Sequence, residues 1–330
     1  MTYYLKEEDP PQEPITNEED EIVWKQGYFT FGNQERIANI TAVKFINSPE
    51  LLVVAHRAVA KLYLVKIEND FCNIIQSLTL RKNGNYYHPD GMALYGDKLY
   101  ITTFSHNCPI VALKDNYTRL EFTNVLKVSN GMPYHGIYIG DEGMFFGGCA
   151  PINKKKTHET CIDFLKHKQK KSIRFKTGFN RRIKGIDLLN NEAMIVGSDD
   201  KREGYRNLFH SYVHSYSIDN KNQKLIHRDD LLLENSQIDG ITLSSDKTKW
   251  YATVHNADDR CGYIIIGSIL KNLNVVFLSK YRCDNFPHGL DVYKEFLSFT
   301  CYGSSSFTVM REKEILADAE EVGEIGAYAP

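Results

Sequence analysis

A short polar step followed by an alternating apolar strand recurs along this 330-residue chain. Each copy has a polar residue before a glycine, and then apolar residues at every second position, as in a half-buried strand. The copies are His88–Leu94, Tyr134–Ile139, Ile183–Leu188, Ile238–Leu243 and Pro287–Val292, with a related step at Ile40–Phe45 where Ala42 replaces the glycine. Their spacing, roughly 45 to 55 residues, is typical of a four-stranded propeller blade.

A second apolar strand follows each copy after a turn such as Tyr95-Gly-Asp-Lys. These second strands are predicted at Leu51–Ala55, Lys98–Thr103, Gly143–Phe146, Ala193–Val196, Trp250–Val254 and Phe296–Thr300. Further strands continue each unit, for example Lys61–Lys66 and Tyr212–Ile218, and no long segment has helical periodicity. The pattern predicts an all-β, six-bladed β-propeller. A β-sandwich or two smaller β-domains is the alternative, and six copies in register favour the ring.

The ends of the chain suggest how the ring closes. The last copy has room for only three strands, so we expect an N-terminal strand at Gly27–Phe31 to close the propeller and remove a free sheet edge. Residues 1–26 are acidic and proline-rich, and we expect a flexible segment there. The predicted organisation is therefore a propeller over residues 27–316 with a C-terminal tail over residues 317–330.

Charge and cysteine usage narrow the class of protein. The net charge of −2 argues against a nucleic-acid partner, and we expect the basic stretches Lys154–Lys156 and Lys166–Lys171 to lie on a solvated outer hairpin. The seven cysteines are scattered, and no pair is separated by the two residues typical of a zinc site or a redox motif. This pattern indicates a reducing compartment. The sequence contains neither a secretory signal nor an apolar run that could span a bilayer. We therefore predict a cytoplasmic protein that does not enter membranes.

Two of the copies carry a family resemblance. Pro89-Asp-Gly-Met-Ala-Leu-Tyr-Gly-Asp-Lys and Ile238-Asp-Gly-Ile-Thr-Leu-Ser-Ser-Asp-Lys resemble the blade signature of the gluconolactonase and NHL-like propeller superfamily. The resemblance implies a divalent metal held by Asp90, at the family's Pro-Asp-Gly aspartate, and by Asp239, where the family has asparagine. In the family a glutamate from the first blade also binds the metal, whereas this chain has Thr41-Ala42 at that step. This chain also has His288 where the family has an aspartate.

The residue that precedes each glycine defines a set that we call the ring positions. They are Thr41, Asp90, His135, Lys184, Asp239 and His288. In a propeller the innermost strand begins at the face where the second strand ends, so the ring positions and the second-strand ends should converge on one mouth of the channel. Six of the eleven histidines fall on this rim, namely His56, His88, His106, His135, His255 and His288.

Two chemistries fit the ring positions. Asp90, Asp239, His135 and His288 could ligate a divalent metal such as zinc, manganese or iron. Alternatively, His135 and His288, which lie three blades apart, could act as general base and acid, with Lys184 as a catalytic cation that holds an anionic group. The predicted substrate-binding residues are His56, Arg57, His88, His106, His255 and Tyr302. Each polar residue could also simply bond neighbouring backbone and hold the ring together.

These features favour an enzyme that acts on a small polar metabolite, in the class of hydrolases, lyases or isomerases and dependent on a divalent metal in one version. The alternative is a non-catalytic propeller that binds a peptide or partner protein on the same face, since propellers host both functions. Protein-binding faces favour Trp, Tyr and Arg anchors, and this rim offers only Arg57 and Tyr302. The surplus of histidines therefore favours the enzyme.

Overall fold

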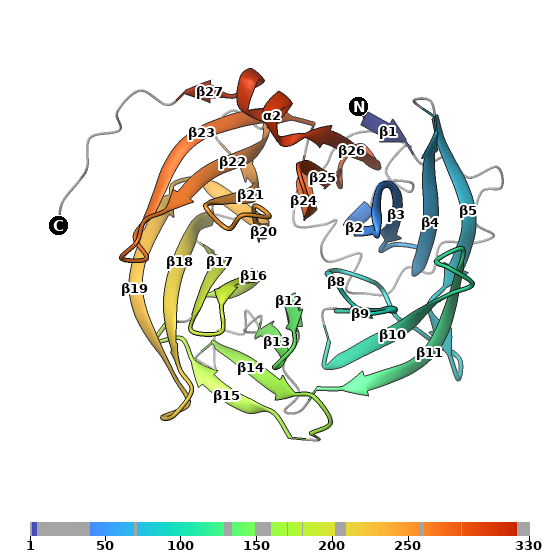
Figure 1. Ribbon diagram of the computed structural model, residues 1–330, viewed down its shortest axis with the longest axis horizontal. Helices are drawn as coiled ribbons and strands as arrows, with labels where there is room; N and C mark the ends of the chain where they lie inside the picture. Colours follow the sequence, from blue (N-terminus) through green and yellow to red (C-terminus); the bar gives the residue numbers. More distant parts are fainter. Residues whose placement is uncertain are drawn as a thin grey trace.

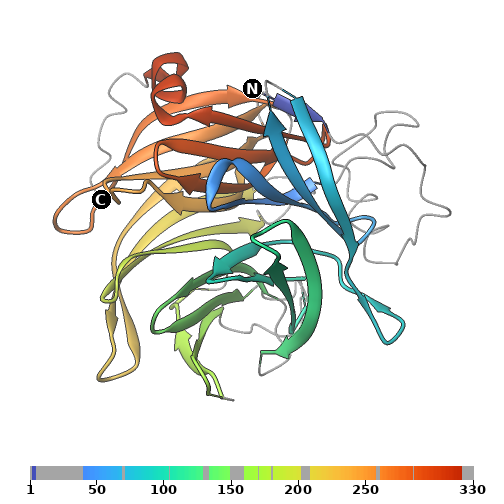
Figure 2. The ribbon, with the colours of Figure 1, turned by 45° about the vertical axis from the view of Figure 1, so that its right-hand side comes forward.

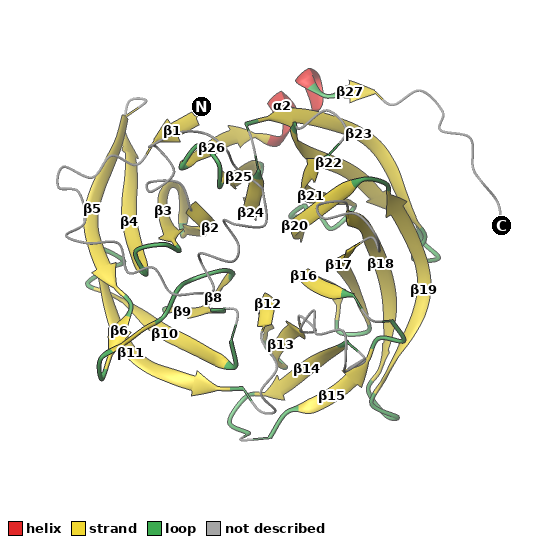
Figure 3. Ribbon diagram, turned by 180° about the vertical axis from the view of Figure 1, so that it is seen from behind, coloured by secondary structure: helices red, strands yellow, loops and turns green. Residues whose placement is uncertain are grey.

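Six antiparallel sheets surround a central axis in the computed structural model, which describes residues 2–4, 40–68, 71–103, 105–128, 134–148, 160–169, 171–179, 181–201, 209–257, 261–284 and 286–321 (Figure 1). Figure 3 shows the same ring from behind. The sheets follow the sequence in order around the axis, and each begins with its innermost strand. The predicted six-bladed, all-β propeller is therefore confirmed.

The blades contain four strands each, with one addition in the fifth. Blades one and two are β2 (Ile40–Ile46), β3 (Ser48–His56), β4 (Lys61–Glu68) and β5 (Phe71–Thr79), then β8 (Met92–Tyr95), β9 (Lys98–Ile101), β10 (Asn107–Lys114) and β11 (Arg119–Lys127). Blades three and four are β12 (Tyr134–Gly140), β13 (Gly143–Gly148), β14 (Cys161–Lys166) and β15 (Ile173–Lys176), then β16 (Arg182–Asn190), β17 (Ala193–Lys201), β18 (Phe209–Asp219) and β19 (Lys224–Leu233). Blades five and six begin with β20 (Ser236–Leu243), β21 (Lys249–Asn256), β22 (Gly262–Ile269) and β23 (Val275–Cys283), and with β24 (Pro287–Tyr293), β25 (Phe296–Cys301) and β26 (Ser306–Arg311). The hairpin of β6 (Arg81–Lys82) and β7 (Asn85–Tyr86) joins blades one and two.

An N-terminal strand closes the ring, as predicted, but a different segment supplies it. The strand β1 (Thr2–Tyr4) pairs with β26, with Thr2 opposite Thr308 and Tyr4 opposite Ser306. Thr and Tyr favour pleated strands, so three such residues suffice to cover the exposed edge of β26. Thr2–Tyr4 is thus part of the propeller, whereas residues 5–39, which include the rest of the expected flexible segment and Gly27–Phe31, lie outside the described residues.

The C-terminal region extends the fold beyond the last blade. Helix α2 (Glu312–Asp318) follows β26, and β27 (Glu320–Glu321) adds a fifth strand to blade five beside β23, within the predicted tail. The helix and the N-terminus lie at the same edge of the ring (Figure 2). Among the described residues, no helix has the length and apolar character to cross a membrane. The predicted basic stretch Lys154–Lys156 lies outside the described residues.

Six hydrophobic clusters hold the blades together, one between each pair of neighbours. The alternation of a strand explains the arrangement, because successive side chains point to opposite faces of a sheet. On β3, Val53 and Ala55 pack toward blade two, whereas Leu52 and Val54 pack toward blade six. Each blade is thus buried on both faces, and the strands read as nearly continuous apolar runs.

The recurring glycine has a steric cause. A Cβ atom on Gly289 would lie 2.5 Å from the carbonyl oxygen of Thr41, and one on Gly91 would lie 2.6 Å from that of His135. At these two steps the inner strands of neighbouring blades are so close that a Cβ atom would clash with backbone, which glycine avoids. The residue before the glycine is consequently fixed at the axis, which is how the fold positions the candidate site.

Candidate functional site

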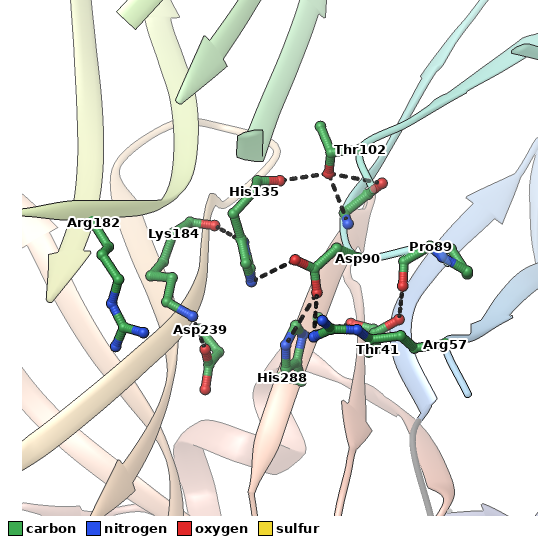
Figure 4. A network of polar contacts seen from close by, with 12 residues as sticks. Thr41, Arg57, Pro89, Asp90, Thr102, His135, Arg182, Lys184, Asp239 and His288 are labelled. Atoms are coloured by element: carbon green, nitrogen blue, oxygen red, sulfur yellow. Dashed lines mark hydrogen bonds and ion pairs between the residues drawn. The ribbon is translucent and has the colours of Figure 1, made fainter. Parts of the chain in front are cut away.

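The ring positions meet at the axis as predicted (Figure 4). All six are buried, and Asp90 is only 1% exposed. Five of them, from Asp90 to His288, line a channel cavity of about 260 Å³. The cavity extends along the inner strands to Lys44, Asp187 and Asp291 at their other ends. It is large enough for a small metabolite, and its wall combines the ionisable side chains at its two ends with apolar side chains of the inner strands, such as Val43, Ile137 and Ile241.

Each ring histidine is anchored through one nitrogen. The Nδ1 atom of His135 lies 2.7 Å from the carbonyl oxygen of Lys184, and that of His288 lies 2.7 Å from the carbonyl oxygen of Thr41. Nδ1 must donate in both contacts, because a carbonyl oxygen only accepts. The anchoring fixes both ring planes and leaves Nε2 of each neutral imidazole with its lone pair.

Both Nε2 atoms point at the carboxylate of Asp90. The Nε2 of His135 lies 3.6 Å from Oδ2, and the Nε2 of His288 lies 3.7 Å from Oδ1. The two oxygens of Asp90 and the Nε2 of His135 are buried and make no hydrogen bond to the described residues. Buried polar atoms without a partner are costly, and lone pairs turned toward a carboxylate repel it. The arrangement therefore calls for a cation between them.

Burial and charge set the protonation states. Burial acts to raise the pKa of Asp90, but His135, once acid protonates it, and the permanently charged Arg57 outweigh this effect and hold the pKa well below its usual range. Burial lowers the pKa of His135 to about 3, against the opposing effect of Asp90. At neutral pH the carboxylate is thus charged and the imidazole of His135 is neutral, the states in which both groups ligate metals.

The donor set of Asp90, His135 and His288 fits a divalent transition metal. One ligand atom from each residue lies within 4.8 Å of the others. Two imidazoles and one carboxylate form a set that zinc and non-haem iron accept, with positions left open. Metal-ligating histidines typically donate their second nitrogen to a carbonyl or carboxylate, as both do here. Asp239, which we predicted as a fourth ligand, is not part of this cluster.

Asp239 instead pairs with the predicted catalytic cation. Lys184 Nζ lies 2.6 Å from Asp239 Oδ1, and both side chains are buried. Burial raises the pKa of Asp239, but Lys184 and the two ring histidines counter it and leave the pKa lowered. Beside this pair, Arg182 bonds both oxygens of Asp199 at 2.6 Å. Lys184 therefore shares its charge with Asp239 and does not project alone into the cavity.

The predicted substrate-binding residues divide into two groups. Arg57 reaches the centre, with its NH1 atom 3.7 Å from Asp90 Oδ1, and Tyr302 stacks on His288 with ring centroids 5.9 Å apart. His88 uses Nδ1 to contact the carbonyl oxygen of Arg57 at 2.8 Å.

The remaining three lie around the rim. His255 stacks on Phe286 at 3.6 Å between centroids, and His56 meets Tyr63 edge-on at 6.4 Å. His106 is exposed. None of these contacts reaches Asp90, so the described geometry assigns the inner ring and Arg57, rather than the whole rim, to the centre.

Sequence reasoning missed the charged groups at the far end of the cavity. Lys44 Nζ lies 2.5 Å from Asp291 Oδ1, and Asp187 accepts hydrogen bonds from Thr242 and from the backbone of Leu243. Each of Lys44, Asp187 and Asp291 stands three residues after a ring position. Alignment of the copies at that offset would have identified this second polar layer.

Comparisons with known proteins show the propeller fold but do not show the function. Neither a family model nor a curated protein matches the chain. Similar solved structures include a Trichoderma reesei carbohydrate-active enzyme of family AA12 (TM-score 0.57, 12% identity, 83% of this chain and 94% of that one). A Bacteroides uniformis protein described as a candidate 6-phosphogluconolactonase has a TM-score of 0.52 at 11% identity, over 86% of this chain and 84% of that one.

A third similar structure is the Cps50 (Swd1) β-propeller domain of Myceliophthora thermophila, with a TM-score of 0.52 at 8% identity over 82% of this chain and 96% of that one. At such identities the likeness shows a shared propeller fold alone. Two of these three proteins are described as enzymes, and the third is described only as a propeller domain. Function must therefore be argued from the site.

Proposed function

We propose that this protein is a metal-dependent enzyme that acts on a small anionic metabolite bound in the channel cavity. The observation that carries the proposal is the carboxylate of Asp90, whose two buried oxygens face the Nε2 atoms of His135 and His288 and accept no hydrogen bond from the described residues. A divalent cation would satisfy all three groups at once. When bound there, such an ion polarises an oxygen of the substrate as a Lewis acid.

The charge balance around the ring favours an anionic substrate. Among the described residues, Asp90, Asp199 and Asp239 are matched by Arg57, Arg182 and Lys184. The buried centre is therefore close to neutral before a metal binds, and a divalent ion would give it a positive excess. A carboxylate or phosphate group on the substrate would offset that excess, because unpaired buried charge is costly.

The residues of the chain have separable roles in this proposal. Asp90, His135 and His288 hold the metal, and Arg57, beside Asp90, binds the anionic group of the substrate through its guanidinium. Lys184 and Asp239, which form an ion pair, orient the substrate. They also hold or release a proton at Lys184 Nζ or at Asp239 Oδ2. Hydrolysis, elimination and isomerisation all need such proton transfer beside a polarised oxygen.

The test is metal content and binding in the purified, full-length protein. Elemental analysis and thermal shift with zinc, manganese, iron and cobalt should identify a stabilising ion, and Asp90→Asn should abolish the response while circular dichroism remains unchanged. A panel of small carboxylates, phosphates and lactones, added to the metal-loaded protein, should then reveal the ligand class. No metal in the protein and no shift with any of these ions would overturn the proposal.

A further inference from the structure

A second cluster of metal-binding side chains lies in the outer half of blade four, away from the channel. His214 belongs to β18, and His227 and Asp230 belong to β19. One ring nitrogen of each histidine and one carboxylate oxygen of Asp230 lie within 4.8 Å of one another. Sequence periodicity gives no sign of this cluster, because the two β19 residues are three positions apart and a regular strand would point them to opposite faces.

A β-bulge brings the three side chains onto one face. His214 stands opposite Asp230, and Tyr216 stands opposite His227, while the register shifts between Ser215 and Tyr216 so that Arg228 has no direct partner. The extra residue restores the alternation that the odd spacing would break. His227 therefore turns toward His214, with the two rings 6.0 Å apart and edge to face. Bulges that re-aim a side chain in this way are frequent beside functional sites.

The buried histidine of the cluster lacks a partner on one nitrogen. His214 is 1% exposed, and its Nε2 lies 2.8 Å from the hydroxyl oxygen of Ser198. Its Nδ1 is buried and makes no hydrogen bond to the described residues. Stacking on Phe179, with centroids 4.6 Å apart, fixes the ring plane. A fixed imidazole with one anchored nitrogen and one open nitrogen is the usual state of a metal ligand.

The charges around His214 also favour a cation at this place. Arg181 lies flat over Tyr212 at 3.4 Å, and its Nε is 4.0 Å from Asp200, whose charge offsets it. The carboxylate of Asp230 is exposed and forms no ion pair with any described residue.

We propose that His214, His227 and Asp230 form a binding site for a divalent transition metal, separate from the channel centre. Ser198 accepts the Nε2–H of His214 and so directs the lone pair of Nδ1 to the metal. Zinc, cobalt, nickel and copper suit two imidazoles and one carboxylate. The exposed pair on β19 gives the ion an entry path, and binding joins the two outer strands of the blade, which stabilises the folded chain.

The experiment compares metal stoichiometry in full-length protein freed of metal with EDTA. Cobalt(II) is the probe, followed by equilibrium dialysis and by visible absorption. His227→Ala and Asp230→Asn alter exposed groups and should each lower the affinity of one equivalent of cobalt by more than about tenfold. Glu234→Gln, which removes another exposed carboxylate of the same blade, should leave binding unchanged.

An Asp90→Asn, His288→Ala background separates this site from the channel. In that background, cobalt binding that remains and is lost on His227→Ala supports the proposal. Binding that persists after His227→Ala and Asp230→Asn overturns it, and so does the absence of any binding in the background. If the channel holds no metal, the double variant and the unmodified protein will both bind one equivalent of cobalt. That result would contradict the proposed metal-dependent enzyme and would leave the blade-four site supported.

Discussion

His135 and His288 come from the third and sixth blades, and their rings face each other across the channel with centroids 5.2 Å apart. Each ring uses Nδ1 to bond the next blade and directs Nε2 at the same carboxylate, that of Asp90. In each ring Nδ1 therefore joins two blades, and the lone pair of Nε2 remains available to bind a ligand. The contacts of Nδ1 show the ring-holding role of these side chains, and a functional role for Nε2 is what we propose.

The first prediction concerns the two histidines. Because each contributes one of three ligand atoms, His135→Ala and His288→Ala should each weaken metal binding by more than about 100-fold. The double variant should lose all activity on the substrate once it is identified. Calorimetric metal titration and turnover measure both effects. A control, Thr102→Val, removes a hydroxyl that donates to the carbonyl of His135 and accepts the N–H of Gly91, but no ligand atom, so it should weaken binding far less. Full turnover in the double variant would contradict the assignment.

The second prediction separates substrate binding from metal binding at Arg57. Arg57→Gln should raise KM for the anionic substrate by about 10- to 100-fold, since a charge-assisted hydrogen bond contributes on the order of 1.5–3 kcal/mol. Arg57→Lys keeps the charge and should recover part of the affinity. Metal content should stay the same in both variants. An unchanged KM with a loss of metal would instead assign Arg57 to the support of Asp90.

The third prediction tests why the polar–glycine step recurs. Gly289→Ala would place a Cβ atom 2.5 Å from the carbonyl oxygen of Thr41 and should lower the free energy of unfolding by about 1–3 kcal/mol. Ala42 occupies the equivalent place in blade one without such a clash, so Ala42→Gly is the matched control and should cost about 1 kcal/mol or less. Chemical denaturation measures both. Equal stability of Gly289→Ala and the unmodified protein would refute the steric explanation.

The fold could be predicted because the repeated step carries two physical demands. Strand alternation requires apolar residues at every second position, and the close approach at Gly91 and its equivalents requires a glycine. Both features are visible in the sequence, and the number of copies gives the number of blades. The same logic placed Asp90, His135 and His288 together at the axis. It could not show that Lys184 and Asp239 neutralise each other, because a 2.6 Å contact depends on side-chain rotamers rather than on register.

Two other features escaped prediction for related reasons. We predict the closing strand at Gly27–Phe31, but Thr2–Tyr4 supplies it, because covering an edge needs only a few backbone hydrogen bonds and so leaves little mark in the sequence. The cluster around His214 depends on a bulge, and a one-residue change of register exchanges the faces of a strand.

The fourth prediction follows from the closing strand. Deletion of residues 1–4 removes the pairing of β1 with β26 and exposes the edge of blade six. A few backbone hydrogen bonds contribute on the order of 1–4 kcal/mol together, so the unfolding temperature should fall by several degrees. Deletion of residues 327–330 is the control of equal size. If both deletions leave the unfolding temperature and the oligomeric state unchanged, β1 does not close the ring in solution.

The last prediction is a loss of stability in acid for the metal-free protein. Burial lowers the pKa of His135 and of His214 to about 3, below the ordinary histidine value near 6.5 in the unfolded chain. Below about pH 6.5 the unfolded state therefore binds protons that the folded state does not, and stability falls until the pH reaches about 3. At pH 5 each histidine should cost about 2 kcal/mol relative to pH 7.5. Urea denaturation in EDTA at the two pH values measures the difference, and His214→Gln should remove about half of it. A stability that is the same at both pH values would show that these rings are solvated or protonated in the folded chain.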